Sequence, residues 1–376
     1  MMKYDNIFIV GAGLFGVVMA ERLASIGQRC VILEKRDHVG GNCASGIDPE
    51  TGIEVHLYGS HIFHTSNAAV WEYINKFTKF NDYQHHVEIK VGNQIYPMPI
   101  SLATMNAFLH KAFTPQEARE FVRSEQTHEK ADNLEDKAIS LIGKTLYDAF
   151  IRGYTCKQWG CDPREMSPDI ITRLPVRYNY NTRYFADTYE GIPLDGYDQL
   201  FKTMLDNPLI EVRLNCDFMD IRDQLPESSL IIYTGPIDHY FNYSEGRLGY
   251  RYVRFNRKSF DCPDFQGNSV INYGDISVPY TRIHEFRHYH PERPYGDRTV
   301  IYEEYSGDGS EKGEMAYPIN TETNRQIFAR YQEKAKLEKN VIFGGRLASY
   351  KYWDMDDTIE ASLKCFEEQV KNKVLE

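Results

Sequence analysis

The sequence lacks the features of secreted, membrane-spanning and nucleic-acid-binding proteins. Its seven cysteines have no CxxC spacing, which argues against a disulfide framework and against a structural zinc site. No apolar run approaches the roughly 18 residues of a membrane-spanning helix, and the amino terminus lacks a signal peptide's long apolar segment. The net charge of −11 argues against broad electrostatic binding of nucleic acid or an acidic membrane. These absences predict a soluble protein of the cytoplasm.

Tryptophan is scarce and tyrosine is abundant, because the 376 residues include 3 Trp and 27 Tyr. Tyrosine combines an apolar ring with a polar hydroxyl, which suits a cleft for a sugar or a nucleotide. We nevertheless expect most of the tyrosines to pack in the core and along strands. Because the chain is acidic, an anionic substrate must be held by a few local arginines. The length exceeds what one hydrophobic core organises, and it predicts two or three domains.

The first forty residues alternate between strand and helix patterns. Residues 6–10 form a short apolar run closed by a glycine, as in a buried parallel strand. Apolar residues recur at helical spacing over 14–26, and Gly27 ends that pattern. Residues 30–33 form a second apolar run that ends at Glu34. The pattern predicts a β-α-β unit.

A glycine motif lies at the turn of this unit. Residues 11–16 read GAGLFG, a GxGxxG pattern after a strand and before a helix, and Glu34 follows about twenty residues later. Gly11 permits the tight turn, Gly13 lets the backbone approach a pyrophosphate, and Gly16 allows close helix–strand packing. The diphosphate would lie at the positive end of the helix, and Glu34 would accept hydrogen bonds from a ribose. The motif therefore predicts a dinucleotide site.

Later segments favour FAD over NAD at this site. Gly40, Gly41 and Asn42 follow the acidic residue, an extension that resembles FAD proteins of the glutathione-reductase and amine-oxidase types. The usual late elements of those proteins are also present, at residues 233–235 (YTG) and 344–346 (GGR). The second would place backbone and an arginine near the flavin.

The middle of the chain has other patterns. Residues 87–91 and 94–96 flank Gly92-Asn93 and predict a hairpin. Residues 101–150 predict helices, one of them started by a capping box at Thr114 to Glu117. Residues 176–189 and 250–287 are aromatic and β-branched and predict antiparallel sheet. Strand patterns return at 230–233 and 341–343, and a helix is predicted over 356–370. The first domain is therefore predicted to be discontinuous.

More specific segments follow one another over most of the chain, and they resemble bacterial UDP-galactopyranose mutase. The two most specific are GYTCKQW at 153–159 and YKYWDMD at 350–356. The others, in chain order, are YGSHIFHT at 58–65, ITRLP at 171–175, NTRYF at 181–185, GIP at 191–193, NY at 272–273, YTR at 280–282 and YP at 317–318. The resemblance runs from Gly11 to Asp356.

The resemblance implies an α/β fold (α+β overall) with a Rossmann-like FAD-binding domain, an inserted helical domain and an antiparallel β-sheet domain. The implied FAD-binding domain comprises residues 1–80, 200–245 and 315–376. The helical domain would span 101–160. The sheet domain, which binds the substrate, would comprise 82–100, 161–199 and 246–314.

The implied enzyme is an isomerase that interconverts UDP-galactopyranose and UDP-galactofuranose and supplies galactofuranose for cell-surface glycans. It requires reduced FAD, whose N5 attacks the sugar's anomeric carbon, yet the reaction has no net redox change. The family resemblance also implies a homodimer. Whether N-acetylated UDP-galactose is also a substrate stays open.

The resemblance assigns roles to individual residues. The implied catalytic residues are Arg173, Arg282, His64 and Asp354, and the two arginines would clamp the diphosphate. The implied substrate-binding residues are Tyr154, Thr155, Trp159, Arg173, Tyr184, Arg251, Asn272, Arg282, Tyr317 and Tyr352. The implied cofactor-binding residues are Gly11, Gly13, Leu14, Phe15, Gly16, Glu34, Lys35, Gly41, Asn42, His61, Thr234, Gly235, Arg346 and Asp354.

Two competing interpretations and one misleading motif remain. An FAD oxidoreductase such as an amine oxidase could use the same fold, and a non-catalytic nucleotide-binding module is the second alternative. Residues 284–288 spell HEFRH, the zinc-protease pattern HExxH. That chemistry requires a helix, whereas the surrounding residues read as strand and turn. We therefore predict no metal site.

Overall fold

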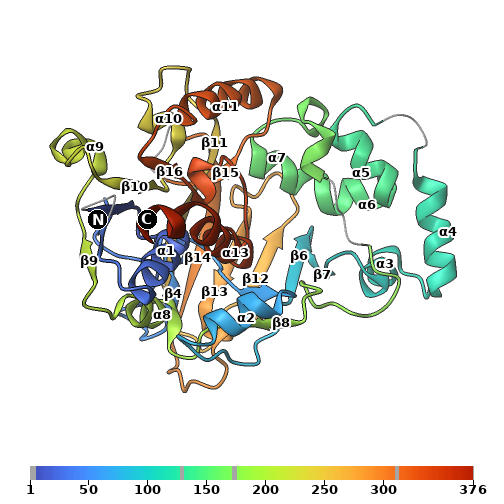
Figure 1. Ribbon diagram of the computed structural model, residues 1–376. Helices are drawn as coiled ribbons and strands as arrows, with labels where there is room; N and C mark the ends of the chain where they lie inside the picture. Colours follow the sequence, from blue (N-terminus) through green and yellow to red (C-terminus); the bar gives the residue numbers. More distant parts are fainter. Residues whose placement is uncertain (1–5, 128–130, 172–175, 310–312, 376) are drawn as a thin grey trace.

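The computed structural model describes residues 6–127, 131–171, 176–309 and 313–375. Two large sheets organise these residues. In Figure 1 the two chain ends and the smaller sheet lie on one side, the larger sheet lies in the middle, and helices α3 to α7 lie on the far side. Among the described residues, no helix is both long and apolar enough to cross a membrane.

The smaller sheet has five parallel strands in the order β16-β10-β1-β2-β9. Their bounds are β1 Ile7–Val10, β2 Cys30–Leu33, β9 Ile210–Arg213, β10 Leu230–Tyr233 and β16 Val341–Phe343. Helices pack against this sheet, and they are α1 (Leu14–Ser25), α8 (Gly196–Leu205) and α13 (Met355–Cys365). Parallel strands covered in this way need near-continuous apolar sequence. The predicted β-α-β unit and the predicted strands at 230–233 and 341–343 are confirmed.

The larger sheet has seven strands in the order β15-β11-β14-β13-β12-β6-β7. Their bounds are β6 Val87–Val91, β7 Gln94–Met98, β11 Tyr250–Phe260, β12 Val270–Tyr273, β13 Arg282–Glu285, β14 Thr299–Gly307 and β15 Glu314–Pro318. All neighbours are antiparallel except β6 and β12, which are parallel. The predicted hairpin is confirmed. β15 belongs to this sheet, although the domain boundaries implied by the resemblance place residues 315–376 in the FAD-binding domain. The division into three domains stays a prediction.

The prediction of antiparallel sheet over 176–189 was wrong. Only β8 (Tyr189–Gly191) forms a strand there, and it pairs with β5 (Phe63–Thr65) outside the large sheet. Asparagine side chains explain the difference. The Asn179 side chain accepts a hydrogen bond from the Asn181 amide at 2.9 Å, and the Asn181 side chain accepts one from the Arg183 amide at 3.0 Å. Such local turns compete with strand pairing.

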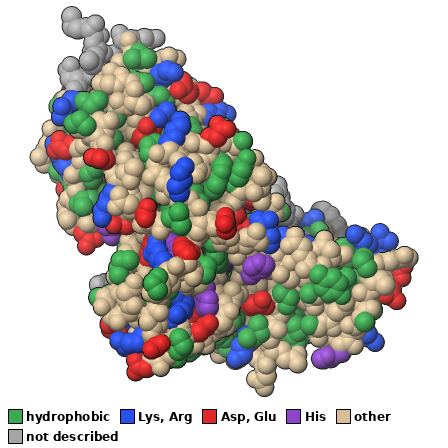
Figure 2. Space-filling view, turned by 90° about the horizontal axis from the view of Figure 1, so that it is seen from below, with side chains coloured by type: hydrophobic (Ala, Val, Ile, Leu, Met, Phe, Trp, Pro, Cys, Tyr) green, Lys and Arg blue, Asp and Glu red, His purple; other side chains and the backbone are tan. Residues whose placement is uncertain are grey.

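The helical lobe follows the β6–β7 hairpin. Its elements are α3 (Leu102–Leu109), α4 (Pro115–Glu125), α5 (Leu134–Ile142), α6 (Lys144–Leu146), a π-helical stretch (Tyr147–Arg152) and α7 (Gly153–Trp159). The predicted capping box is present, because Thr114 and Glu117 exchange hydrogen bonds at the start of α4. In Figure 2 hydrophobic, acidic and basic side chains are interspersed over the face shown.

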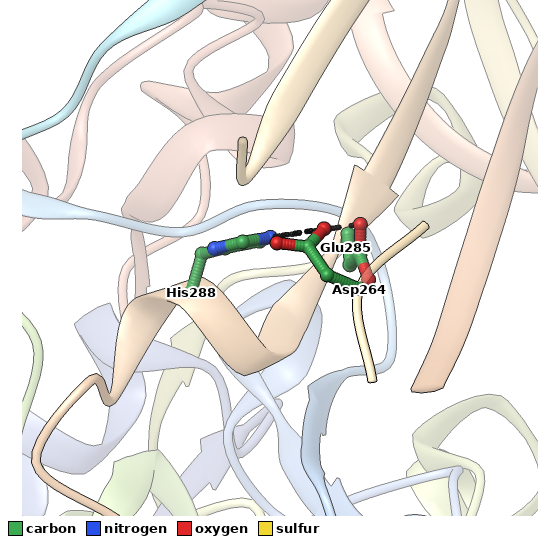
Figure 3. Close-up of side chains that lie close together, drawn as sticks. All are labelled: Asp264, Glu285 and His288. Atoms are coloured by element: carbon green, nitrogen blue, oxygen red, sulfur yellow. Dashed lines mark ion pairs between the residues drawn. The ribbon is translucent and has the colours of Figure 1, made fainter. Parts of the chain in front are cut away.

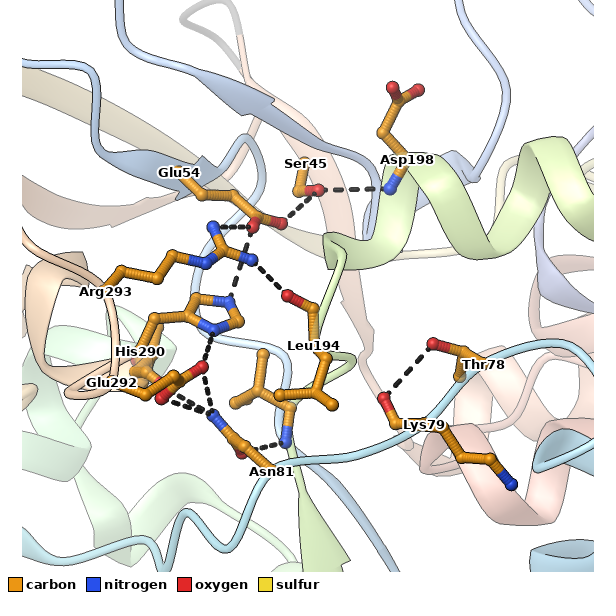
Figure 4. Close-up of polar contacts among 12 residues, drawn as sticks. Ser45, Glu54, Thr78, Lys79, Asn81, Leu194, Asp198, His290, Glu292 and Arg293 are labelled. Carbon is orange, nitrogen blue, oxygen red and sulfur yellow. Dashed lines mark hydrogen bonds and ion pairs between the residues drawn. The ribbon is translucent and has the colours of Figure 1, made fainter.

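A buried ionic cluster joins β4 (Glu54–His56) to the segment after β13 (Figure 4). The Glu54 carboxylate accepts from Arg293 and from Ser45, both at 2.8 Å, and it lies 3.4 Å from His290. Burial would raise the pKa of Glu54, but these contacts, His290 first, lower it to about 2. Asn81 adds a hydrogen bond to the Tyr289 carbonyl at 2.8 Å. The cluster fixes the 286–290 segment against the loop that contains His61.

The remaining elements are short, with the exception of one surface helix. They are the 3-10 turns Gly41–Cys43, Pro163–Glu165, Pro168–Ile171, Arg222–Gln224 and Phe286–Tyr289, the π-helical stretch Phe366–Val370, β3 Ser45–Ile47, α2 Ala68–Ile74, α9 Phe218–Ile221, α10 Ile237–Tyr240, α11 Glu322–Ala335, α12 Gly345–Ala348 and α14 Lys371–Leu375.

Candidate active site

A cavity of about 1120 Å³ extends from the glycine turn after β1 to the side chains of the seven-stranded sheet. Most residues that the sequence predicts for the site line it. Among those described, the predicted residues that do not line it are Gly16, Trp159 and Arg251. Arg173 lies outside the described residues. Segments from both sheets and from the helical lobe therefore meet at one chamber.

At one end of the cavity, the glycine turn has the conformation that the motif predicts. Gly11 has φ +102°, and a side chain there would collide with Thr234. A Cβ on Gly16 would collide with the Gly11 carbonyl oxygen, so α1 packs against the turn as closely as its backbone allows. The Gly11 amide donates to the Leu33 carbonyl at 2.8 Å, and the Thr234 hydroxyl donates to the Val10 carbonyl at 2.6 Å. This turn leaves backbone facing the cavity.

Glu34 has a second role that sequence reasoning missed. Its carboxylate is buried and accepts hydrogen bonds from the backbone amides of Ala12 and Arg36, both at 2.8 Å. It therefore holds the glycine turn itself, in addition to the expected contact with a ribose. Arg36 reaches from this point to Glu314 of β15 at 2.5 Å and stacks over the Tyr58 ring at 4.6 Å. Arg36 and Glu314 were also missed, because they are distant in the sequence.

At the other end of the cavity, a chain of buried polar side chains supports Arg282. The Arg282 guanidinium donates to the Tyr154 hydroxyl and lies 3.4 Å from Glu304. Glu304 also contacts His284 at 2.9 Å. Burial would raise the pKa of Glu304, but Arg282 and then His284 lower it to about 2. The carboxylate thus stays ionised and fixes the arginine.

The far side of His284 continues into the histidine-bearing loop. Its Nδ1 contacts the Ser60 hydroxyl, which also contacts the Tyr289 hydroxyl. His61 follows Ser60 in this loop, and its ring is held in place because Nδ1 contacts the Gly59 carbonyl at 2.7 Å. Burial lowers the pKa of His61 to about 4. Sequence reasoning missed Glu304, and it considered His284 only as part of a zinc motif.

Tyrosines form the wall between these two ends. Tyr317 stacks on Tyr352, with ring centroids 5.4 Å apart, and Arg346 lies over Tyr352 at 5.0 Å. Tyr184 and Tyr352 expose 42% and 53% of their surface, although both line the cavity. Large aromatic faces open to a chamber are suited to stacking on a ligand.

Several buried polar atoms at the cavity fit a bound polar ligand. Asn272 Oδ1 and Arg346 Nε have no hydrogen-bond partner within the described parts of the chain, whereas Arg282 Nε faces the Glu304 carboxylate at 3.4 Å. Leaving such a group unsatisfied costs about 1–3 kcal/mol. Together with the glycine turn, these atoms are consistent with a dinucleotide at one end and an anionic ligand at the other.

Arg251 and Trp159 lie behind the cavity wall. The buried Arg251 side chain donates to the Gln158 carbonyl at 2.9 Å and to the Ser306 hydroxyl at 3.2 Å. It thereby joins the end of α7 to the large sheet. Trp159 packs against Tyr317 with ring centroids 6.5 Å apart. Both residues support the wall, and their predicted contact with substrate stays a prediction.

The HExxH motif does not form the geometry of a zinc protease. His284 lies in β13 and His288 in a 3-10 turn, and His284 points to Ser60 and Glu304 instead. His288 does lie near two carboxylates, Asp264 at 3.3 Å and Glu285 at 3.6 Å (Figure 3). Both oxygens of Glu285 already accept backbone amides, from residues 265 and 266. We interpret this group as an ion-pair cluster.

The fold and the site place this chain among proteins that bind a dinucleotide on a Rossmann-like domain. The family model of NAD(P)-binding Rossmann-like domains matches residues 9–77. Solved structures support the same fold. They include a reduced UDP-galactopyranose mutase, with a TM-score of 0.76 at 16% identity over 98% of this chain and 96% of that one. A putrescine oxidase bound to putrescine also matches, with a TM-score of 0.59 at 11% identity over 97% and 99%.

The chain belongs to the UDP-galactopyranose mutase family. The model of that family matches residues 149–352. A probable UDP-galactopyranose mutase of Klebsiella pneumoniae is 39% identical over 98% of this chain and 95% of its own length. A dTDP-fucopyranose mutase of Escherichia coli is 36% identical over 98% of this chain and 99% of its own length. The resemblance seen in the sequence motifs is thereby confirmed.

Proposed function

We propose that this protein interconverts UDP-galactopyranose and UDP-galactofuranose and requires FAD in its reduced form. The observation that supports this most is the single cavity that joins a dinucleotide-type glycine turn to the Arg282 site. When bound, reduced flavin would supply a nucleophile for the anomeric carbon of the sugar. We further propose that the protein is a cytoplasmic homodimer, and that its product enters cell-surface glycans.

The residues of the chain would hold the two ligands at opposite ends of the cavity. The backbone of the glycine turn and the start of α1 would bind the FAD diphosphate, because a helix N-terminus attracts anions. Glu34 and Arg346 would contact the cofactor. At the other end, Arg282 would hold the substrate diphosphate and stabilise the charge that develops as UDP departs. We assign the same role to Arg173.

The sugar nucleotide itself has a second candidate. The relative from Escherichia coli acts on dTDP-fucopyranose by its name and is nearly as similar as the Klebsiella relative, with 36% against 39% identity. The same chemistry of ring contraction would serve both substrates. The two differ at the base, at the ribose 2′ position and at carbon 6 of the sugar, so a direct assay distinguishes them.

One experiment tests these proposals together. Purified protein is tested for bound FAD, reduced with dithionite, and incubated separately with UDP-galactofuranose and with dTDP-fucofuranose. We expect the pyranose to form from UDP-galactofuranose, only after reduction, and without consumption of reductant. Preferred conversion of the dTDP sugar would assign the second substrate. Stoichiometric oxidation of a substrate would support the FAD oxidoreductase interpretation instead, and absence of conversion of either sugar would reject the mutase proposal.

A further inference from the structure

A carboxylate outside the cavity holds His64, which lines the cavity. His64 lies in β5, and its Nδ1 is 2.9 Å from Oδ2 of Asp187. The other oxygen of Asp187, Oδ1, accepts a hydrogen bond from the Ser66 hydroxyl at 2.7 Å. Asp187 itself is not among the residues that line the cavity. The carboxylate is thus tied on both oxygens, and one of them is used to orient the histidine.

The ring of His64 is also fixed by packing. It stacks on Phe185 with ring centroids 3.6 Å apart and an interplanar angle of 17°. The backbone at His64 pairs with Glu190 of β8, two residues after the turn that contains Asp187 and Thr188. Only 12% of the His64 side chain is exposed. Strand pairing, stacking and the carboxylate together leave the imidazole one orientation.

This arrangement determines which nitrogen carries the proton. An ionised carboxylate only accepts, so a neutral His64 donates from Nδ1 and its Nε2 keeps a lone pair. Within the described parts of the chain, Nε2 has no hydrogen-bond partner, while the ring lines the chamber. Asp354, the residue before α13, lines the same chamber. Burial raises the pKa of Asp354, and His64 is the first of the charges that oppose this effect.

The mutase reaction needs a base and an acid of this kind. Conversion of the pyranose into the furanose breaks the bond between C1 and the O5 ring oxygen and forms the bond between C1 and O4. O5 therefore gains one proton and O4 loses one. A single group that takes a proton from O4 and gives one to O5 thus ends the reaction in the protonation state in which it began. A general acid–base of this type contributes about 10²–10⁴-fold to a rate.

We propose that His64 Nε2 exchanges this proton, and that Asp187 is a positioning residue that keeps His64 in the Nδ1–H tautomer. The inference rests on the proposed function, because it concerns the proton transfers of the same reaction. Charged and titratable groups surround His64 on several elements. They are Asp187 before β8, Asp354 at the N-cap of α13, His85 on the other face of Phe185, and the Arg183–Glu190 ion pair, whose Glu190 lies in β8.

The decisive variant is Asp187→Asn, which retains the size of the side chain. The amide can donate to Nδ1 and so favours the tautomer with the proton on Nε2. We expect kcat to fall by about 10²–10⁴-fold, with KM changed less than about three-fold and FAD retained. The pH–rate profile should change as well, because the group that faces His64 Nδ1 changes from a hydrogen-bond acceptor to a donor. Asp198→Asn is the matched control, since the Asp198 side chain is exposed and pairs with Lys202 on the surface of α8, and it should retain wild-type kinetics.

Two further measurements test the inference if Asp187→Asn does not fold. In wild-type protein with ¹⁵N-labelled histidine, the His64 signals, identified by their loss in His64→Gln, should report the Nδ1–H tautomer. External imidazole should restore part of the activity of His64→Gly. Wild-type protein with the proton on Nε2, or Asp187→Asn with unchanged kcat and pH profile, would overturn the inference while the mutase assignment stands. Wild-type protein that converts neither sugar nucleotide would instead remove the proposed function, and the inference with it.

Discussion

The two ends of the cavity are built in different ways. The dinucleotide end consists mainly of backbone, at the glycine turn between β1 and α1, and Glu34 orders that backbone through two amides. The sugar end consists of side chains, and the central ones, Arg282 and Glu304, come from neighbouring strands of the large sheet. The first end depends on the absence of side chains, and the second depends on charges that hold one another in place.

This difference determines how substitutions act. A backbone site is disturbed when an added atom moves the chain, so the effect reaches the fold as well as the ligand. A site of buried, mutually paired charges is disturbed when one partner is removed, because the remaining charge is left without compensation. Substitutions at the two ends of the cavity should therefore differ in whether they change the fold or only the binding of the ligand.

Among substitutions that compare the two ends of the cavity, the largest effect is expected for Arg282→Ala. The variant should retain FAD but lose conversion by about 10–150-fold, because a charge-assisted contact contributes about 1.5–3 kcal/mol. Lysine should restore little, because a point charge cannot reproduce a bidentate guanidinium. Initial rates, with flavin content as the folding control, measure the effect. Arg213→Ala is the control, since Arg213 is exposed and pairs with Glu211 at the surface; equal rates for the two variants would contradict the assignment.

Gly16→Ala tests the backbone end. A Cβ would collide with the Gly11 carbonyl oxygen and lie 3.2 Å from Ile9, and overpacking of this kind destabilises by about 1–3 kcal/mol. We expect a lower denaturant midpoint together with loss of bound FAD. Gly296→Ala provides the comparison, because no atom lies within 4 Å of an added Cβ there. A Gly16→Ala protein of wild-type stability and flavin content would show that the packing tolerates a side chain.

The buried His56, which ends β4 and accepts a hydrogen bond from the His61 amide at 3.0 Å, makes stability depend on pH. Burial lowers the pKa of His56 to about 3, against about 6.5 in an unfolded chain. Between these values the unfolded chain binds a proton that the folded protein does not, so the free energy of unfolding falls as the pH falls below about 6.5. The slope from this histidine is at most about 1.4 kcal/mol per pH unit.

His56→Gln should remove that part of the slope. Denaturant unfolding of both proteins between pH 7.5 and pH 5 measures it, and the two curves should converge as the pH falls. His110→Asn, at an exposed helix end with φ 52°, should keep the wild-type slope. Parallel curves for wild type and His56→Gln would show that His56 does not titrate in this range.

The smallest effect is expected for Glu314→Gln. The Arg36–Glu314 ion pair crosses the dinucleotide end, but 38% of the Glu314 side chain is exposed, so solvent screens it. FAD affinity should change by less than about 1 kcal/mol, or about five-fold. Fluorescence titration of the apoprotein with FAD measures this. A larger loss would mean that side chains, and not only backbone, dominate this end of the cavity.

The sequence predicted the dinucleotide end well, because a strand, a glycine turn, a helix and a second strand follow one another within about thirty residues. The sequence did not predict site residues whose partners are distant along the chain. Glu304 and Asp187 have no local signature, since each becomes informative only when β13 or β5 lies beside it. Residues 176–188 misled for another reason: their composition favours strands, but side chains such as Asn179 bind the backbone locally. Arg251 was assigned to the substrate site by the family resemblance alone, and it is not among the residues that line the cavity.

The order of strands in the small sheet has a consequence for synthesis. β1 lies beside β10, and β10 is flanked on its other side by β16, which follows β1 by more than three hundred residues. Ser362 of α13 donates to the Phe15 carbonyl on α1 at 2.9 Å, and Ile342 and Phe366 complete the core around Phe15. A nascent chain on the ribosome therefore exposes its glycine turn, without this cover, until the segment up to Phe366 has been made. Cofactor capture is accordingly expected only after that segment has formed, and removal of residues 341–376 should abolish it.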